Sequence, residues 1–187
     1  RRWGRSMTDV QIRAFIRAQL LVLLPLYGMA NVQVIADYQP TQQGRETGPA
    51  IYIHSLGEEQ EGRQSSRYQP GLSIPVALQR TEHQMLATTM QITVYAPEDA
   101  TLTPPLPTDL ARVASMALQS VAFVEALVQQ YPGSGVRRVT PIRRPYIVND
   151  RGQFEQSPSF DITLAHTVSI VVEAPQVDAV QYGIHRV

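Results

Sequence analysis

Residues 89–100 read TMQITVYAPEDA, and residues 167–179 read TVSIVVEAPQVDA. Each stretch alternates β-branched residues with other types, as a strand with one buried face does, and each stops at an Ala-Pro pair followed by an acidic turn. Proline cannot donate to a sheet ladder, so it marks the place where a strand ends. The chain therefore contains two long strands of similar design, and we expect both to leave the sheet at the same edge.

One long helix is predicted between these two strands, over residues 108–131. Thr108 is a suitable N-cap, Asp109 favours the helix dipole in the first turn, and Pro132 with Gly133 ends the helix. Its apolar face is wide, so we expect it to be buried over much of its surface against the sheet. The main apolar positions are Leu110, Val113, Ala114, Ala117, Val121, Val124 and Val128.

A second amphipathic helix is predicted near the N-terminus, over residues 8–24. Thr8 and Gln11 form a capping box, and the segment from Pro25 to Gly28 ends the helix. The basic start and the apolar run at 20–26 resemble a secretory signal only superficially, because charged residues lie between them. That run is also too short to span a membrane. We therefore expect a helix docked on the domain, and no membrane partner.

The remaining pattern indicates strands at 31–38, 50–56, 83–96 and 160–174. The polar stretch 57–71 is either a mobile loop or the tip of a long hairpin. Near residues 165–166 the apolar phase changes, which indicates a bulge or a switch in burial. The connections after the first helix are too short for parallel crossovers. These elements predict an α+β fold: a mixed, mainly antiparallel sheet with two helices packed on one face and long hairpin or loop extensions.

Length and composition limit the possible classes of protein. The 187 residues suffice for one domain, which we place at 8–176 between an N-terminal arm (1–7) and a C-terminal arm (177–187). The net charge is zero, which argues against a dedicated nucleic-acid binder. All 16 basic residues are Arg, and the chain has no Cys. Disulfides and thiolate metal sites are therefore excluded.

The search for catalytic chemistry gives no motif. The four histidines are spread along the chain, with no pair at helical ligand spacing, so we expect no metal and no cofactor. A small enzyme would need a site assembled from isolated residues such as His54, Asp161 and His166. Because nothing in the spacing requires such a site, we expect a protein that is not an enzyme.

Charged residues supply the candidates for interaction. An acidic cluster and a basic cluster stand out, and the basic one also fits an exposed edge strand that Pro141 and Pro145 protect from further pairing. The C-terminal arm either adds a strand to an adjacent subunit or is a frayed end. The candidate interface residues are Glu58, Glu59, Glu61, Arg63, Arg67, Arg137, Arg138, Arg143, Arg144, Tyr182 and Arg186.

Several segments together resemble a known family. They are TDVQIRAFIRAQLLVLLPL (8–26), NVQVIADYQP (31–40), GPAIYIHSL (48–56) and the late long helix. In this order they resemble tailed-phage neck and tail-terminator proteins, including the gateway neck group. The resemblance covers about residues 8–175, at the level of element order. The polar excursion at 57–71 and the tail at 179–187 depart from the family pattern.

The resemblance implies a structural protein of the virion neck, assembled in the host cytoplasm. It implies a ring, usually a hexamer, that terminates the tail tube and joins it to the head-side connector or adaptor. The partners would be further copies of the chain, the tail tube and the sheath protein, with DNA passing through the lumen. Another head-completion or baseplate structural protein would fit the same architecture.

Overall fold

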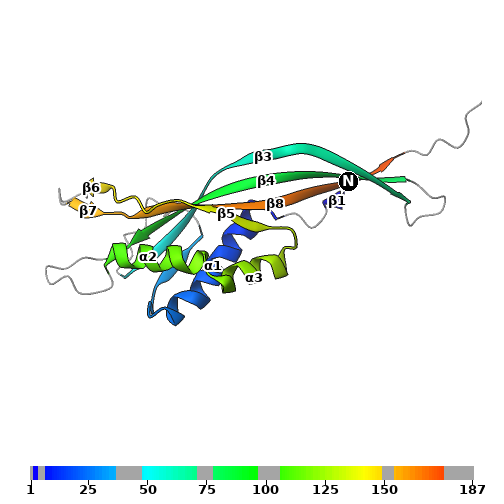
Figure 1. The fold of residues 1–187 in the computed structure, drawn as a ribbon. Helices are drawn as coiled ribbons and strands as arrows, with labels where there is room; N and C mark the ends of the chain where they lie inside the picture. Colours follow the sequence, from blue (N-terminus) through cyan, green and yellow to red (C-terminus); the bar gives the residue numbers. More distant parts are fainter. Residues whose placement is uncertain are drawn as a thin grey trace, which may run out of the picture.

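The computed structural model describes residues 2–3, 7–36, 48–70, 78–96, 106–148 and 154–174. Within them, three helices lie on one face of a long twisted sheet, and the sheet extends well beyond the helices at one end (Figure 1). The predicted α+β class with a mixed, mainly antiparallel sheet is confirmed. Three of the four segments of the resemblance become α1, β2 and the start of β3, and the late long helix becomes two helices described below.

The main sheet has the strand order β1-β8-β4-β3-β2, and β5 also pairs with β8. Because β4 occupies one side of β8, the short strands β1 and β5 share its other side. A separate two-stranded sheet joins β6 to β7. The strands are β1 (Arg2–Trp3), β2 (Gln33–Ile35), β3 (Ala50–Pro70), β4 (Leu78–Tyr95), β5 (Gly135–Val139), β6 (Tyr146–Val148), β7 (Phe154–Gln156) and β8 (Ser159–Ala174).

The two strands that end in Ala-Pro are antiparallel neighbours. The β4–β8 register runs from Leu78 opposite Ala174 to Thr93 opposite Ser159 without a shift. The last residues of β4 therefore lie at one end of this ladder, and Ala174, the last residue of β8, lies at the other end. The expectation that both strands leave at the same edge is wrong, because similar endings do not determine relative strand direction.

The polar stretch 57–71 belongs almost wholly to β3, which pairs with β4 as far as Pro70. Of the two alternatives, the long hairpin is confirmed. Register shifts occur between Ser55 and Gly57 and between Glu61 and Ser65. Such bulges increase the local twist of a hairpin and leave individual residues unpaired. The far part of this hairpin projects past the helices together with β1 and the last part of β8 (Figure 1).

One strand pair in the sheet is parallel. Gln33 of β2 lies opposite Ala50 of β3, and the pairing continues to Ile35 and Tyr52. The expectation that the connections were too short for parallel pairing is wrong at this point. The connection over residues 36–49 reaches the length of about a dozen residues that parallel pairing needs.

Helix α1 (Asp9–Leu26) begins as its sequence indicates. The Thr8 hydroxyl accepts a hydrogen bond from the Gln11 amide at 3.3 Å, and the Gln11 side chain accepts one from the Thr8 amide at 2.9 Å. The capping box is confirmed. Pro25 lies inside the last turn, and the helix ends at Leu26; Tyr27 is its C-cap and is followed by Gly28 with φ of 82°.

The predicted single helix over 108–131 is two helices, α2 (Pro107–Leu118) and α3 (Val121–Gln130), bent by 51°. Ser120 explains the break. Its hydroxyl donates to the Ala117 carbonyl at 2.7 Å and accepts from the Phe123 amide at 3.2 Å, so it satisfies backbone groups of both helices. Thr108 is not the N-cap of α2, because Leu106 occupies that position and Pro107 begins the helix.

The wide burial expected for this segment is correct for α2 and wrong for α3. In α3 only Phe123 and Leu127 are buried, while Val121 is 72% exposed. None of the described helices is by itself long and apolar enough to cross a membrane. Only α2 and α3 taken together, as a bent pair, meet that length and composition.

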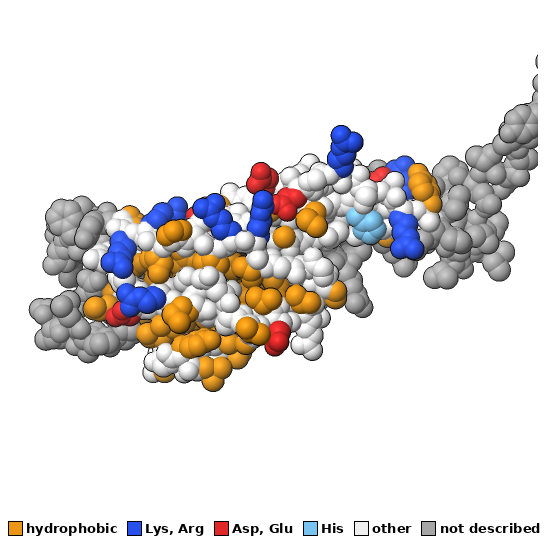
Figure 2. Space-filling view, viewed as in Figure 1, with side chains coloured by type: hydrophobic (Ala, Val, Ile, Leu, Met, Phe, Trp, Pro, Cys, Tyr) orange, Lys and Arg blue, Asp and Glu red, His pale blue; other side chains and the backbone are white. Residues whose placement is uncertain are grey.

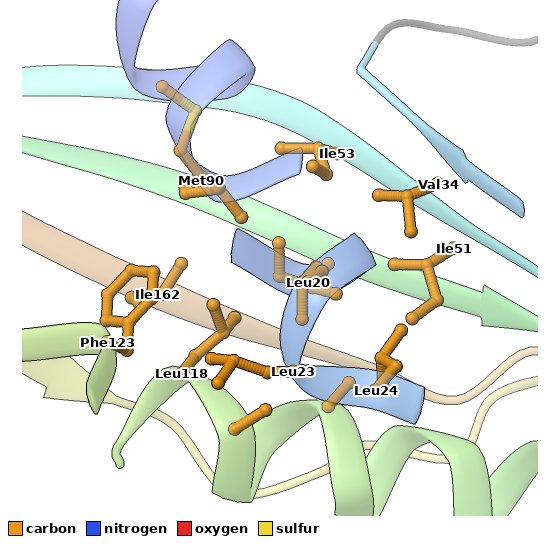
Figure 3. Packing of buried hydrophobic residues seen from close by; sticks show 14 of the residues in the cluster. Leu20, Leu23, Leu24, Val34, Ile51, Ile53, Met90, Leu118, Phe123 and Ile162 are labelled. Carbon is orange, nitrogen blue, oxygen red and sulfur yellow. The ribbon is translucent and has the colours of Figure 1, made fainter. Parts of the chain in front are cut away.

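The core lies between the helices and the near half of the sheet. Leu20, Leu23 and Leu24 point from α1 toward Ile51 and Ile53 of β3 and toward the other helices (Figure 3). The Phe15 ring of α1 lies 5.4 Å from that of Phe123 and 5.8 Å from that of Tyr131, measured between centroids. From β4 and β8 the fully buried apolar residues are Met90, Ile92, Val94, Phe160, Ile162 and Leu164.

The cap assignment can be tested by equilibrium urea unfolding. Ser120→Ala should lower the free energy of unfolding by about 0.5–2 kcal/mol, because the Phe123 amide loses its acceptor. Thr108→Ala is the matched control and should change it by about 0.5 kcal/mol or less. Equal losses in both variants, or a larger loss for Thr108→Ala, would contradict the break at Ser120.

Candidate interaction surface

The apolar core ends abruptly along β4 and β8. On the helix-side face of β8, Ile162 and Leu164 are fully buried, His166 is 2% exposed, and Val168 is only half-buried. Because the β4–β8 register has no shift here, the phase change predicted near residue 166 is a switch in burial and not a bulge. Beyond this point none of the three described helices lies over the sheet (Figure 1).

Three polar side chains from three strands close the core at this switch. The His166 Nε2 of β8 lies 2.8 Å from the Thr88 hydroxyl of β4, which donates to the Glu58 carboxylate of β3 at 3.1 Å. The Thr88 hydroxyl has one proton and donates it to Glu58. It therefore accepts the hydrogen bond from His166, whose Nε2 carries the proton. The His166 Nδ1 is then a buried acceptor with no hydrogen-bond partner. We call these three residues the polar closure.

Burial lowers the pKa of His166 below its ordinary value, and the nearby Glu58 carboxylate raises it in part. The imidazole is therefore held neutral, consistent with its single donor position. Sequence reasoning missed the polar closure as a unit. The available signal was that Thr88 and His166 interrupt the apolar alternation of their two strands.

The acidic candidates are divided between the two faces of the sheet. Glu58 lies opposite Thr88 on the helix-side face, whereas Glu59 and Glu61 lie opposite Ala87 and Met85 on the outer face. Glu61 forms an ion pair with Arg137 of β5. Figure 2 shows acidic and basic side chains standing together over the middle of the sheet. One acidic and one basic candidate thus meet within a single chain.

The basic cluster occupies the edge of the sheet. A bulge lies between Val136 and Arg138, so that Arg137 and Arg138 are both exposed. Arg143 exchanges two backbone hydrogen bonds with Ser159, at 2.8 and 2.9 Å, and its guanidinium lies 2.5 Å from the Asp161 carboxylate. Arg138 and Arg144 are exposed and form no ion pair with any residue that the structure describes. The edge-strand interpretation therefore holds for this segment.

Arg63 and Arg67 lie on the exposed, projecting part of β3. Arg63 lines an open depression of about 350 Å³ beside the second bulge, where Gly62 adopts a φ of 68° that favours glycine. The other residues around it are Glu61, Gly62, Ser65, His83, Met85 and Thr167. Tyr182, Arg186 and the predicted C-terminal arm lie outside the described residues.

The residues of the alternative enzyme site do not converge. His54 and Asp161 lie on the outer face, separated by Gln91 of β4, and His166 lies on the opposite face. The His54 ring stacks on Tyr52 at 6.3 Å, and Asp161 contacts Arg143. Within the described ranges no three His, Asp or Glu side chains lie together as metal ligands would. His54, Asp161 and His166 therefore do not form one site.

A solved structure shares this architecture. It is the cryo-EM structure of the sheath/tube terminator of an extracellular contractile injection system, PVC, in its extended state. The TM-score is 0.54 at 12% sequence identity, and the match covers 98% of this chain and 65% of the other. The chain thus spans just under two thirds of that protein's length. At this identity the likeness shows a shared fold.

The family follows from the sequence match. The model of the E217 gateway protein gp29 family matches residues 11–176, most of the chain, and this protein belongs to that family. The resemblance to gateway neck proteins, which rested on the segments of α1, β2 and the start of β3 and on the late long helix, is confirmed. A search of curated proteins finds no match.

The polar closure predicts a specific pH dependence of stability. The pKa of His166 is lower in the folded state than in the unfolded state, so below about pH 6.5 the unfolded state binds more protons. The contribution of the neutral imidazole to the free energy of unfolding is therefore present above about pH 6.5 and is lost as the pH falls below it. His166→Gln removes the titrating group and should flatten the dependence of the free energy of unfolding on pH between about 7 and 5. The same slope in both proteins would contradict the buried neutral state.

Proposed function

We propose that this chain is a structural protein of the phage neck that terminates the tail tube. The observation that carries the proposal is the gateway-family match over residues 11–176. The shared fold with a sheath/tube terminator supports it independently. The chain acts by occupying a position in an assembly, so its function depends on surfaces and not on a reaction.

The proposed working form is a ring of identical subunits, six in number, seated between the tail tube and the head-side connector. The zero net charge supports a lumen through which DNA passes without being gripped, since tight binding would require many cationic contacts to phosphate. The tail tube and the sheath protein are the partners on the tail side. The protein works in the virion and needs no cofactor for this role.

The surfaces available for these contacts lie on the projecting sheet and on its edge. Arg63 and Arg67 extend from β3, whereas Arg138 and Arg144 extend from the edge formed by β5 and the segment after it. Exposed arginines suit contacts with acidic neighbours, because the guanidinium forms bidentate bonds with carboxylates. Glu61, Arg137 and Arg143 already take part in ion pairs within the chain and so contribute less.

The ring can be tested with the purified full chain. Mass measurement in solution followed by negative-stain electron microscopy should give a closed ring with sixfold symmetry. A twelvefold ring would assign the chain to the head-side adaptor position instead. A monomer at every soluble concentration would contradict the proposal.

The edge surface can be tested in infectious particles. Arg138→Glu combined with Arg144→Glu should leave the thermal midpoint unchanged and lower the yield of complete virions, since both side chains are exposed. Arg112→Glu on α2, whose side chain is 58% exposed, is the matched control and should keep the yield. A normal yield for the double variant would remove this edge from the interface.

A further inference from the structure

Strand β3 forms a border of the sheet over most of its length. Its described partner on the side away from β4 is β2, and that pairing ends at Ile35 opposite Tyr52. The strand continues to Pro70 and remains paired with β4 on its other side. In Figure 1 it runs along one margin of the projecting sheet. We call residues 56–68 of β3 the open edge, because no strand that the structure describes pairs with them on the side away from β4.

The register identifies the backbone groups that point out of the open edge. The Val94 amide of β4 donates to the Pro158 carbonyl at 2.9 Å, on the side of β8. Since backbone groups alternate sides along a strand and the β4–β8 register has no shift, even-numbered residues of β4 direct theirs toward β8 and odd-numbered ones toward β3. The β3 residues opposite even-numbered β4 residues therefore direct their N–H and C=O groups away from β4. They include Glu58, Gln60, Ser66 and Tyr68.

An extended strand is the natural occupant of such an edge. Its N–H and C=O groups recur at the spacing of a second backbone, and adding a strand pairs all of them at once. The side chains over residues 56–60 and 62–68 are exposed, so none of them covers the edge. Charged side chains and bulges protect an edge from arbitrary apolar strands. The charges of the open edge therefore decide which strand it accepts.

These charges follow a fixed order along the edge. Glu59 lies nearer the core, whereas Arg63 and Arg67 lie nearer the far end of the hairpin. Glu59 lies opposite Ala87 and Arg67 lies opposite Thr81, so both stand on the outer face of the sheet. None of the three charged side chains forms an ion pair or hydrogen bond with another residue that the structure describes. A complementary strand needs a negative charge toward the far end and a positive charge toward the core.

The sequence after β8 has this pattern. Pro175 ends the ladder of β8, because it cannot donate to a partner strand. Residues 180–184 then read VQYGI, in which β-branched and aromatic residues alternate with Gln and Gly, as in a strand. Asp178 precedes this run and Arg186 follows it. The segment is thus a short strand pattern with an acidic residue at its start and a basic one at its end.

This segment also starts at the far end of the projecting sheet. Ala174 of β8 lies opposite Leu78 of β4, which in turn lies opposite Pro70 of β3. Strands β3 and β8 are both antiparallel to β4, so both run toward this end. To reach β3 of its own chain, the segment would have to reverse direction and cross β4. A neighbouring molecule offers the same open edge without that crossing.

We propose that residues 176–187 of one copy add a strand, antiparallel to β3, to the open edge of the next copy. The inference rests on the proposed ring and names one contact that joins its subunits. The antiparallel orientation brings Asp178 toward Arg67 and Arg186 toward Glu59, and opposite charges across a strand pair stabilise it. The parallel orientation would bring like charges together, so the charges select one direction.

Because the chain has no cysteine, single introduced thiols give an unambiguous cross-linking test on the full chain. Arg67→Cys and Asp178→Cys are placed in separate chains, one of them tagged, and an equimolar mixture is treated with a short bismaleimide. The mixture should give a covalent dimer with one chain of each kind. The matched control replaces Arg67→Cys by Arg112→Cys on α2, where the native side chain is 58% exposed, and should give no such dimer. A yield no higher than that of the control would overturn the proposal.

A chain that carries both Arg67→Cys and Asp178→Cys tests which copy supplies the strand. Linkage between copies should give covalent multimers on a denaturing gel. A product that consists of internally linked monomers alone would place the segment on β3 of its own chain and would overturn the proposal.

Charge exchange tests the orientation of the added strand. Arg67→Glu should weaken self-association, measured by sedimentation velocity, about threefold or more, because it brings two carboxylates together. Adding Asp178→Arg to the same chain should restore the association. Arg112→Glu is the matched control and should associate as the unaltered chain does. No restoration in the double variant would contradict the antiparallel alignment.

The results for the added strand and for the proposed function are separable. Rings of the unaltered chain in electron micrographs, without cross-links between copies, would reject the added strand and leave the proposed function standing. A monomeric unaltered chain would reject both.

Discussion

The architecture depends on one uninterrupted ladder of antiparallel hydrogen bonds between β4 and β8. Both are interior strands of the sheet, and every other strand of that sheet attaches to one of them or to β3. Because their pairing has no register shift, the same two strands pack against the helices in the core and then continue through the projecting part of the sheet. The helices cover only the first part of this ladder, and the polar closure of Glu58, Thr88 and His166 marks where that cover stops.

This arrangement connects the fold to the proposed role in assembly. A globular protein usually shortens or protects sheet edges, since open edges invite pairing with other chains. Here the long sheet is retained outside the core, with bulges and charged side chains along β3 and β5. The helix layer exposes single large apolar side chains among polar ones, with Val10, Val22 and Leu26 on α1 and Val121 on α3 the most exposed. The molecule therefore offers exposed surfaces both on the projecting sheet and on the helices.

Local signals predicted the elements well and their relations poorly. Three predicted features depend only on residues close together in the sequence, and each is found in the structure. They are the capping box at Thr8, the alternation in β4 and β8 and the end of the core near residue 166. The parallel pairing of β2, the opposite ends of the Ala-Pro strands and the pairing of Glu61 with Arg137 depend on contacts distant in sequence. The break between α2 and α3 also has a local cause, the N-cap Ser120, but the apolar residues on both sides of it fit one continuous helix, so the sequence did not reveal it.

The central claim is that the β4–β8 ladder continues as a stable structure beyond the helix-covered core. Amide hydrogen exchange on the full chain measures this directly, because exchange reports the stability of individual backbone hydrogen bonds. The account predicts that the amides over residues 80–86 and 167–172 are protected, as those over residues 88–94 are. Exchange at the rate of an unstructured chain in the first two segments, with protection confined to the third, would contradict it.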